Sequence, residues 1–131
     1  MKMYLRVALL LILPLLTLNC VVGQEPAAIL NKVEESLTSG NAAMLASTFH
    51  SRVELTLEGK SQIQSSVQAQ YVMSQFFASY PPSSFTLSHH GETGGTLYAL
   101  GEYRSAKGTF EVNIFIRFEG GTNRISELRF E

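Results

Sequence analysis

The segment Gly108–Glu119, GTFEVNIFIRFE, constrains the fold more than any other part of the chain. Five of its six large apolar residues fall on every second position, and they are Phe110, Val112, Ile114, Ile116 and Phe118. This period of two predicts a β-strand with one buried face and one mostly solvated face. A strand of this length needs partners on both edges and a cover over its apolar face, so we expect a sheet that carries helices.

Three helices are predicted before this strand, at Gln24–Leu37, Ala42–Phe49 and Val67–Tyr80. The third has the longest apolar stripe, formed at helical spacing by Ala69, Val72, Met73, Phe76, Phe77 and Tyr80,. Ser39-Gly40 is typical of a helix end, and Asn41 is typical of an N-cap. Because its spacing is helical, most of the stripe on the third helix is expected to face the core.

Strands account for the rest of the pattern. Val53–Leu57 alternates as a short strand, and the polar segment Lys60–Ser65 is either a loop or a weak edge strand. Four further strands, joined by short Gly-containing turns, are predicted at Ser84–Gly91, Thr96–Arg104, Gly108–Glu119 and Arg124–Phe130,. Helices followed by an antiparallel meander indicate an α+β domain with about three helices on one side of a bent sheet.

The N-terminal residues have the pattern of a secretory signal peptide. Lys2 and Arg6 precede the uncharged aliphatic run Val7–Leu18, which is shorter than the roughly 20 residues that span a membrane. We expect cleavage after residue 23, a single domain at 24–131, and export to the periplasm or medium. Two alternatives remain: an uncleaved anchor, and a lipoprotein in which Leu18-Asn19-Cys20 acts as a lipobox and Cys20 is lipidated.

The composition of residues 24–131 excludes several kinds of site. This part has no cysteine, and the whole chain has no aspartate, so a disulfide, a thiolate and the usual metal-ligand motifs are excluded,. Without Lys2 and Arg6, eight of the ten basic residues remain against eleven acidic ones, a net charge of −3. This balance argues against nucleic acid or anionic lipid as a partner. No Gly-rich loop joins a strand to a helix, so we expect no phosphate-binding loop. No pair of histidines has the spacing of a metal-ligand motif either, so we expect no metal, and we expect no cofactor.

The order of elements resembles the nuclear transport factor 2-like, cystatin-like α+β fold, in which a strongly bent sheet wraps around the helices as a cone. Three segments are also similar to domain of unknown function 4783, a family of small exported proteins of Bacteroidota. They contain the Ser39-Gly40-Asn41 junction, the helix end from Phe76-Phe77 to Pro81-Pro82, and the closing Glu127-Leu128-Arg129. The resemblance covers nearly all of Gln24–Glu131. It implies the fold and the export, but no activity.

Enzymes with this fold use the open end of the cone as a pocket, so the resemblance directs attention to residues that could line it. Adjacent residues of a strand point to opposite faces, and His89 is predicted to share a face with Phe85 and Leu87 and to point into the cone. The candidate ligand pocket consists of His89, Tyr98, Tyr103, Met73, Phe76 and Tyr80. A small apolar ligand is the expected occupant. The alternative is a cofactor-free isomerase or dehydratase in which His89, either Tyr98 or Tyr103, and His50 form an acid–base group. If His50 has no such role, it is simply the residue that ends the second helix.

The polar face of the central strand is a second candidate. Phe115 lies there beside Asn113 and Arg117, and an outward aromatic residue can anchor a protein partner or a weak homodimer. No complete set of acid, base and orienting group can be assembled from the sequence, so no catalytic residue is assigned. The sequence therefore predicts a non-catalytic module that binds a small ligand in the cone or a protein on the sheet.

Overall fold

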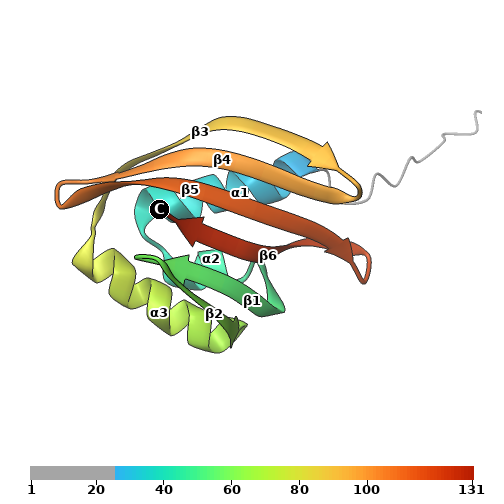
Figure 1. Cartoon of the computed structure of the whole chain (residues 1–131), viewed down its shortest axis with the longest axis horizontal. Helices are drawn as coiled ribbons and strands as arrows, with labels where there is room; N and C mark the ends of the chain where they lie inside the picture. The colour runs from blue at the N-terminus through green and yellow to red at the C-terminus, as the bar shows by residue number, and fades with distance from the viewer. Residues whose placement is uncertain (1–25) are drawn as a thin grey trace, which may run out of the picture.

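A computed structural model describes residues 26–131 (Figure 1). The expected signal peptide, its cleavage site and Cys20 lie outside the described residues. The elements are α1 Pro26–Ser39, α2 Ala42–Ala46, β1 Phe49–Leu57, β2 Lys60–Ser65, α3 Ser66–Ser79, β3 Pro82–Thr93, β4 Thr96–Ser105, β5 Gly108–Glu119 and β6 Thr122–Phe130. The predicted α+β order is confirmed, and Lys60–Ser65 is a strand. No helix in the described part is long and apolar enough to cross a membrane.

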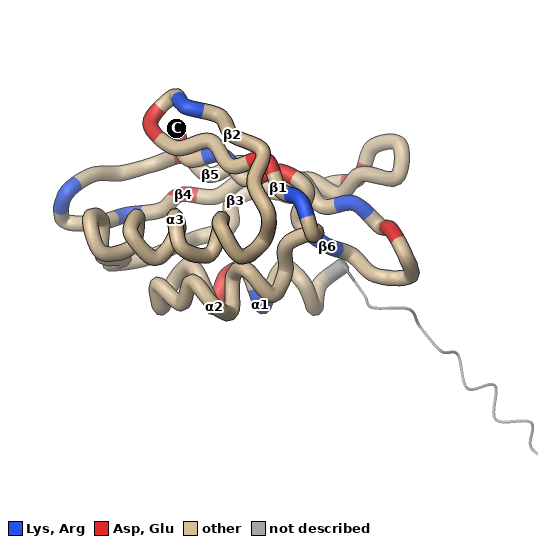
Figure 2. The backbone as a smooth tube through the Cα atoms, turned by 90° about the horizontal axis from the view of Figure 1, so that it is seen from below, with Lys and Arg blue, Asp and Glu red and all other residues tan. Residues whose placement is uncertain are grey.

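The six strands form one sheet in the order β2-β1-β6-β5-β4-β3. Strands β3 to β6 make the predicted antiparallel meander, and β1 joins it through parallel pairing with β6. The three helices lie on one side of the sheet (Figure 2). We call the opposite side, which the helices do not cover, the outer face. Strands β2 and β3 are the two edges of the sheet (Figure 1).

Side-chain caps position the helices close to where the sequence predicts them. Asn41 Oδ1 accepts a hydrogen bond of 3.0 Å from the backbone N–H of Met44 at the start of α2. Ser65 Oγ accepts one of 3.2 Å from Gln68 N–H at the start of α3,. The predicted extension of the second helix to Phe49 is wrong, because α2 ends at Ala46.

Strand pairing explains this early end. Phe49 begins β1, lies opposite Ile125 of β6 and is buried, so pairing in the sheet outweighs the local helical pattern. His50 consequently belongs to β1 and is not the end of a helix.

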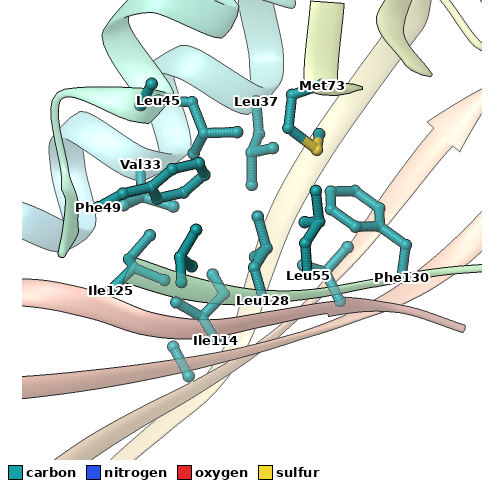
Figure 3. Close-up of a cluster of buried hydrophobic side chains, with 14 of the residues drawn as sticks. Val33, Leu37, Leu45, Phe49, Leu55, Met73, Ile114, Ile125, Leu128 and Phe130 are labelled. Carbon is teal, nitrogen blue, oxygen red and sulfur yellow. The ribbon is translucent and has the colours of Figure 1, made fainter. Parts of the chain in front are cut away.

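The core lies between the helices and the sheet, and its side chains converge from both layers (Figure 3). Val112, Ile114 and Ile116 of β5 have no exposed surface, which confirms the alternation at the centre of this strand. The alternation fails at Phe118, which is 61% exposed. Phe118 lies opposite Asn123, close to the turn at Gly120-Gly121, so the core covers only the middle of β5.

Candidate functional site

The interior of the predicted pocket is filled by an aromatic cluster. It consists of Phe76, Tyr80, Tyr103, Phe110 and Phe130, with the ring of Phe76 at its centre and only 4.7 Å from that of Phe130 between centroids. Met73 and Tyr103 have no exposed surface. The Tyr103 hydroxyl donates a hydrogen bond of 2.5 Å to the backbone carbonyl of Tyr80, and burial raises the pKa of Tyr103 to about 12. Four of the six predicted pocket residues thus pack as core or at its margin.

A small cavity remains at the rim of this cluster. It has a volume of about 200 Å³ and is lined by Leu57, Glu58, Val72, Gln75, Phe76, Ser79 and Tyr80. The Tyr80 hydroxyl donates to Glu58 Oε1 over 2.9 Å, and this bond raises the pKa of Tyr80. The volume is below the roughly 300–1,000 Å³ of typical ligand pockets, so the cavity has room only for a very small ligand.

His89 and Tyr98 lie on the other side of the sheet. Leu87 pairs with Gly101, but the next pair is His89 with Leu100, so Ser88 is an extra residue in β3. Such a bulge reverses the side to which the following residues point, and the prediction that His89 shares a face with Leu87 is wrong. His89 is exposed, and its Nε2 lies 3.5 Å from the Tyr98 hydroxyl on the outer face.

His50 is not part of a site with His89. It lies on β1, and β6, β5 and β4 separate this strand from β3. Its Nε2 lies 3.3 Å from the backbone oxygen of Arg117, and its Nδ1 lies 4.0 Å from a carboxylate oxygen of Glu119. The structure therefore does not bring together the three members of the predicted acid–base group. Among residues 26–131, no group of three or more His, Cys, Asp or Glu side chains is arranged to hold a metal ion.

Phe115 lies on the outer face together with Asn113 and Arg117, as the alternation of β5 predicts. It is half-buried, because the guanidinium carbon of Arg129 lies 5.9 Å from the centre of its ring. Arg129 also donates a hydrogen bond to Glu127, and this contact raises the pKa of the guanidinium. The outer face thus carries an aromatic ring that is only partly covered, by a neighbour from its own sheet.

The most exposed apolar surface lies elsewhere, where β2 runs beside α3. A groove of about 650 Å³, here called the β2–α3 groove, is lined by Gln62, Ile63, Gln64, Val67, Gln68, Tyr71 and Val72. Ile63 is 63% exposed, Val67 76% and Tyr71 66%; they are three of the four large apolar side chains that are exposed in the described part. Helix α3 has no charged residue (Figure 2), and β2 has only Lys60. The groove is therefore uncharged, and its exposed apolar side chains lie among glutamines.

This surface was not predicted from the sequence, although two signals for it exist. Val67 and Tyr71 are four residues apart and thus lie on one face of α3, away from the apolar stripe,. Ile63 is a large apolar residue within an otherwise polar segment. Each signal alone is weak, since single exposed apolar residues are common, and only the turn from β2 into α3 brings them together.

The two edges of the sheet differ in how well they are protected. Strand β3 begins with Pro82, and its pairing with β4 shifts register twice; proline and bulges are features that discourage further strands from pairing. Strand β2 has neither, and all its residues pair in unbroken register with β1, from Lys60 opposite Leu57 to Ser65 opposite Arg52. Its outward N–H and C=O groups form a regular template for another strand.

Gln64 carries a polar atom that lacks a partner. Its Nε2 donates to Gln62 Oε1 over 2.9 Å, but its own Oε1 is buried and has no hydrogen-bond partner within residues 26–131. A buried acceptor without a donor costs about 1–3 kcal/mol. Gln64 lines the β2–α3 groove, and this unpartnered oxygen lies buried at its margin.

A polar cavity of about 270 Å³ lies between α1 and the β5–β6 hairpin. It is lined by Ala28, Ile29, Lys32, Ser47, Thr48, Thr122, Asn123 and Arg124. Arg124 Nη1 donates hydrogen bonds of 3.3 Å to the backbone carbonyls of Ser47 and Phe49. These bonds give the guanidinium a structural role in joining β6 to the start of β1.

Comparison with known proteins agrees with this fold. The model of the family "Domain of unknown function (DUF4783)" matches residues 30–131. A crystal structure of a DUF4783 family protein from Bacteroides uniformis is 26% identical, has a TM-score of 0.74, and is aligned over 77% of this chain and 94% of its own. One from Bacteroides ovatus is 23% identical, with the same TM-score and coverage of 82% and 94%.

A more distant structural neighbour shows the wider fold. It is an NTF2-like protein of unknown function from Silicibacter pomeroyi, which is 17% identical, has a TM-score of 0.57, and is aligned over 80% of this chain and 90% of its own. At this identity the likeness concerns the fold alone. No curated protein matches the chain.

Proposed function

The chain belongs to the DUF4783 family, whose function is unknown and whose fold is nuclear transport factor 2-like, and we propose that it is a non-catalytic protein-interaction module. Its binding site is the β2–α3 groove together with the free edge of β2. One observation carries the proposal: the exposed apolar residues Ile63, Val67 and Tyr71 gather beside the one sheet edge that has neither a proline nor a bulge. Exposed apolar patches of this kind mark sites of protein contact.

Strand addition is the binding mode that this geometry favours. A partner segment in extended conformation pairs its backbone with β2, and its side chains on one face enter the groove beside Val67 and Tyr71. The backbone bonds supply affinity, and the groove selects apolar side chains. Within residues 26–131 the candidate acid–base residues are not enclosed together: the His89–Tyr98 pair lies on the open outer face, and His50 lies on β1, with three strands between it and β3.

The outer face is the second surface of the module. Phe115 offers an aromatic centre, and Arg117, Glu127 and Arg129 surround it with both signs of charge. A two-fold contact across such a face lets each carboxylate meet a guanidinium. We propose weak self-association here, with Phe115 as the main contact, because charge pairs on a rim add register more than affinity.

Selection of peptides tests the proposed site, because it requires no identified partner. The probe is a phage-displayed library of random peptides, selected on the wild-type chain and then measured against variants. Peptides with alternating apolar residues are expected to bind the wild type and to lose binding with Ile63→Lys and with Tyr71→Lys. The matched control is Phe118→Lys, because Phe118 is equally exposed, at 61%, but lies at the β5–β6 hairpin. Failure to select any peptide, or equal binding to Ile63→Lys, would show that the groove is not the site.

A further inference from the structure

We infer that the occupant of the β2–α3 groove is a second copy of this chain, with the two β2 strands paired antiparallel about a two-fold axis at Ile63. The inference rests on the proposed function, because it names the partner of the same surface. Pairing would join two six-stranded sheets edge to edge into one continuous sheet.

The sequence of β2, KSQIQS, is complementary to itself in this register. Residues directly opposite each other in an antiparallel pair point to the same face. With Ile63 opposite its own copy, Gln62 faces Gln64 and Ser61 faces Ser65 of the second copy. An exposed isoleucine is thereby buried on an isoleucine, amide faces amide, and hydroxyl faces hydroxyl. The Ile63 pair lies on the two-fold axis and occurs once, whereas the amide pair and the hydroxyl pair each occur twice, as the symmetry requires.

Charge supports the same register. The only charged residue of β2 is Lys60, which in this arrangement lies opposite Ser66 of the second copy. Like charges directly opposite each other destabilise strand pairing, and none meet here. The uncharged α3 helices add no repulsion (Figure 2).

Gln64 supplies an independent reason. Its buried Oε1 has no donor within the described residues, and the register places Gln62 of the second copy opposite it. The side-chain amide of that Gln62 has two N–H groups, and the hydrogen bond between Gln62 and Gln64 within one copy uses only the oxygen of Gln62. Rotation of the Gln64 side chain towards the second copy would bring this buried oxygen to that donor.

The helices contribute the apolar part of the contact. Both α3 helices lie on the same side of the joined sheet, because the two-fold axis is perpendicular to it. Helix α3 follows β2 directly and presents Val67 and Tyr71 at the groove. Because Ser66 lies opposite Lys60 of the second copy, Val67 lies beside the start of the second copy's β2, so a strand contact and a helix contact form together.

Disulfide cross-linking tests the arrangement. In the full chain with Cys20→Ser, the variant Ile63→Cys has a single thiol whose copy lies directly opposite. Opposite Cα atoms are about 4.5–5.5 Å apart in an antiparallel pair, within the range that a disulfide spans. Mild oxidation of Ile63→Cys is expected to form covalent dimers about tenfold faster or more than oxidation of Phe118→Cys, because pairing raises the effective thiol concentration.

The serine positions test the register itself. Ser61→Cys alone is expected to cross-link slowly, because the two copies of this residue are four positions apart along the strands. A mixture of Ser61→Cys and Ser65→Cys is expected to cross-link rapidly, since these residues face each other. Faster cross-linking of Ser61→Cys with itself than of Ile63→Cys would overturn the proposed axis.

Failure of this inference can be told apart from failure of the proposed function. If Ile63→Cys cross-links no faster than Phe118→Cys, the second copy is not the partner of the groove, whether or not the outer face associates. Library peptides that bind the wild type and not Ile63→Lys would then still support the groove as a binding site for another protein. If neither the rapid cross-linking nor the Ile63-dependent peptide binding is observed, both this inference and the proposed function are overturned.

Discussion

The hydroxyl of Tyr103 donates a 2.5 Å hydrogen bond to the backbone carbonyl of Tyr80, so that the end of α3 is tied to β4. This bond and the aromatic cluster around it close the part of the fold in which a ligand pocket is expected. The cluster therefore stabilises the domain, and the effect of ionising Tyr103 on this stability can be measured.

Tyr103 makes stability depend on alkaline pH. Burial raises its pKa from the ordinary 10.0 to about 12, so the folded chain keeps the phenol neutral where the unfolded chain ionises it. Its contribution to the free energy of unfolding is complete below pH 10 and is lost as the pH rises towards 12. In denaturant melts, the free energy of unfolding of Tyr103→Phe is expected to fall less steeply with rising pH over this interval than that of the wild type. Tyr71→Phe removes an exposed phenol and is the control; equal slopes for Tyr103→Phe and wild type would contradict the assignment.

Phe76 is expected to be the most costly residue of α3 to truncate. Its ring lies within 6.1 Å, centroid to centroid, of those of five other aromatic residues. Phe76→Ala should lower the free energy of unfolding by about 3–5 kcal/mol. Val67→Ala, on the exposed side of the same helix, should change it by about 0.5 kcal/mol or less. A loss below about 1 kcal/mol for Phe76→Ala would mean that the core does not depend on this ring.

Two glycines in the sheet offer a matched test of packing. A Cβ at Gly101 would lie 2.6 Å from Cζ of Phe85 and 2.9 Å from the backbone oxygen of Thr86, which cannot move aside. A Cβ at Gly91 would meet the hydroxyl of Tyr98 at 2.5 Å, but this half-exposed side chain is free to turn. Gly101→Ala is expected to cost about 1–3 kcal/mol and Gly91→Ala clearly less, as measured by thermal melts. The reverse order would show that the two faces of the sheet are assigned wrongly.

The fold could be predicted largely from the sequence because its determinants are local and periodic. The stripe of Met73, Phe76 and Phe77 and the alternation of Val112, Ile114 and Ile116 each arise from neighbours along one element, and all six residues are buried. The end of α2 could not be predicted, because Phe49 enters β1 through pairing with the distant β6.

The sites could be predicted less well because they depend on contacts between elements. The bulge at Ser88, which turns His89 to the outer face, leaves no mark in a sequence that alternates smoothly across it. The β2–α3 groove combines single apolar residues from two elements, and its importance comes from the position of β2 at the edge of the sheet.

Phe115→Glu tests association through the outer face. The added charge should abolish the weak association that we propose for this face at high concentration, because it places two carboxylates at the centre of the contact. Strand pairing at Ile63 should be unaffected, and circular dichroism should show an unchanged fold. Phe118→Glu, on the same strand, is the control. Unchanged sedimentation of Phe115→Glu, or loss of its fold, would mean that Phe115 has only a structural role.

Hydrogen exchange at β2 tests most directly the claim that this edge binds another strand. The amide N–H groups of Gln62–Ser65 that point away from β1 are exposed in a single copy and hydrogen-bonded once a strand is added,. Exchange is measured on the wild-type chain when dilute, when concentrated, and when saturated with a selected peptide. The account predicts that these amides exchange more slowly in both the concentrated and the peptide-bound samples, while those of β3 are unchanged. Equal exchange of the β2 amides in all three samples would contradict it.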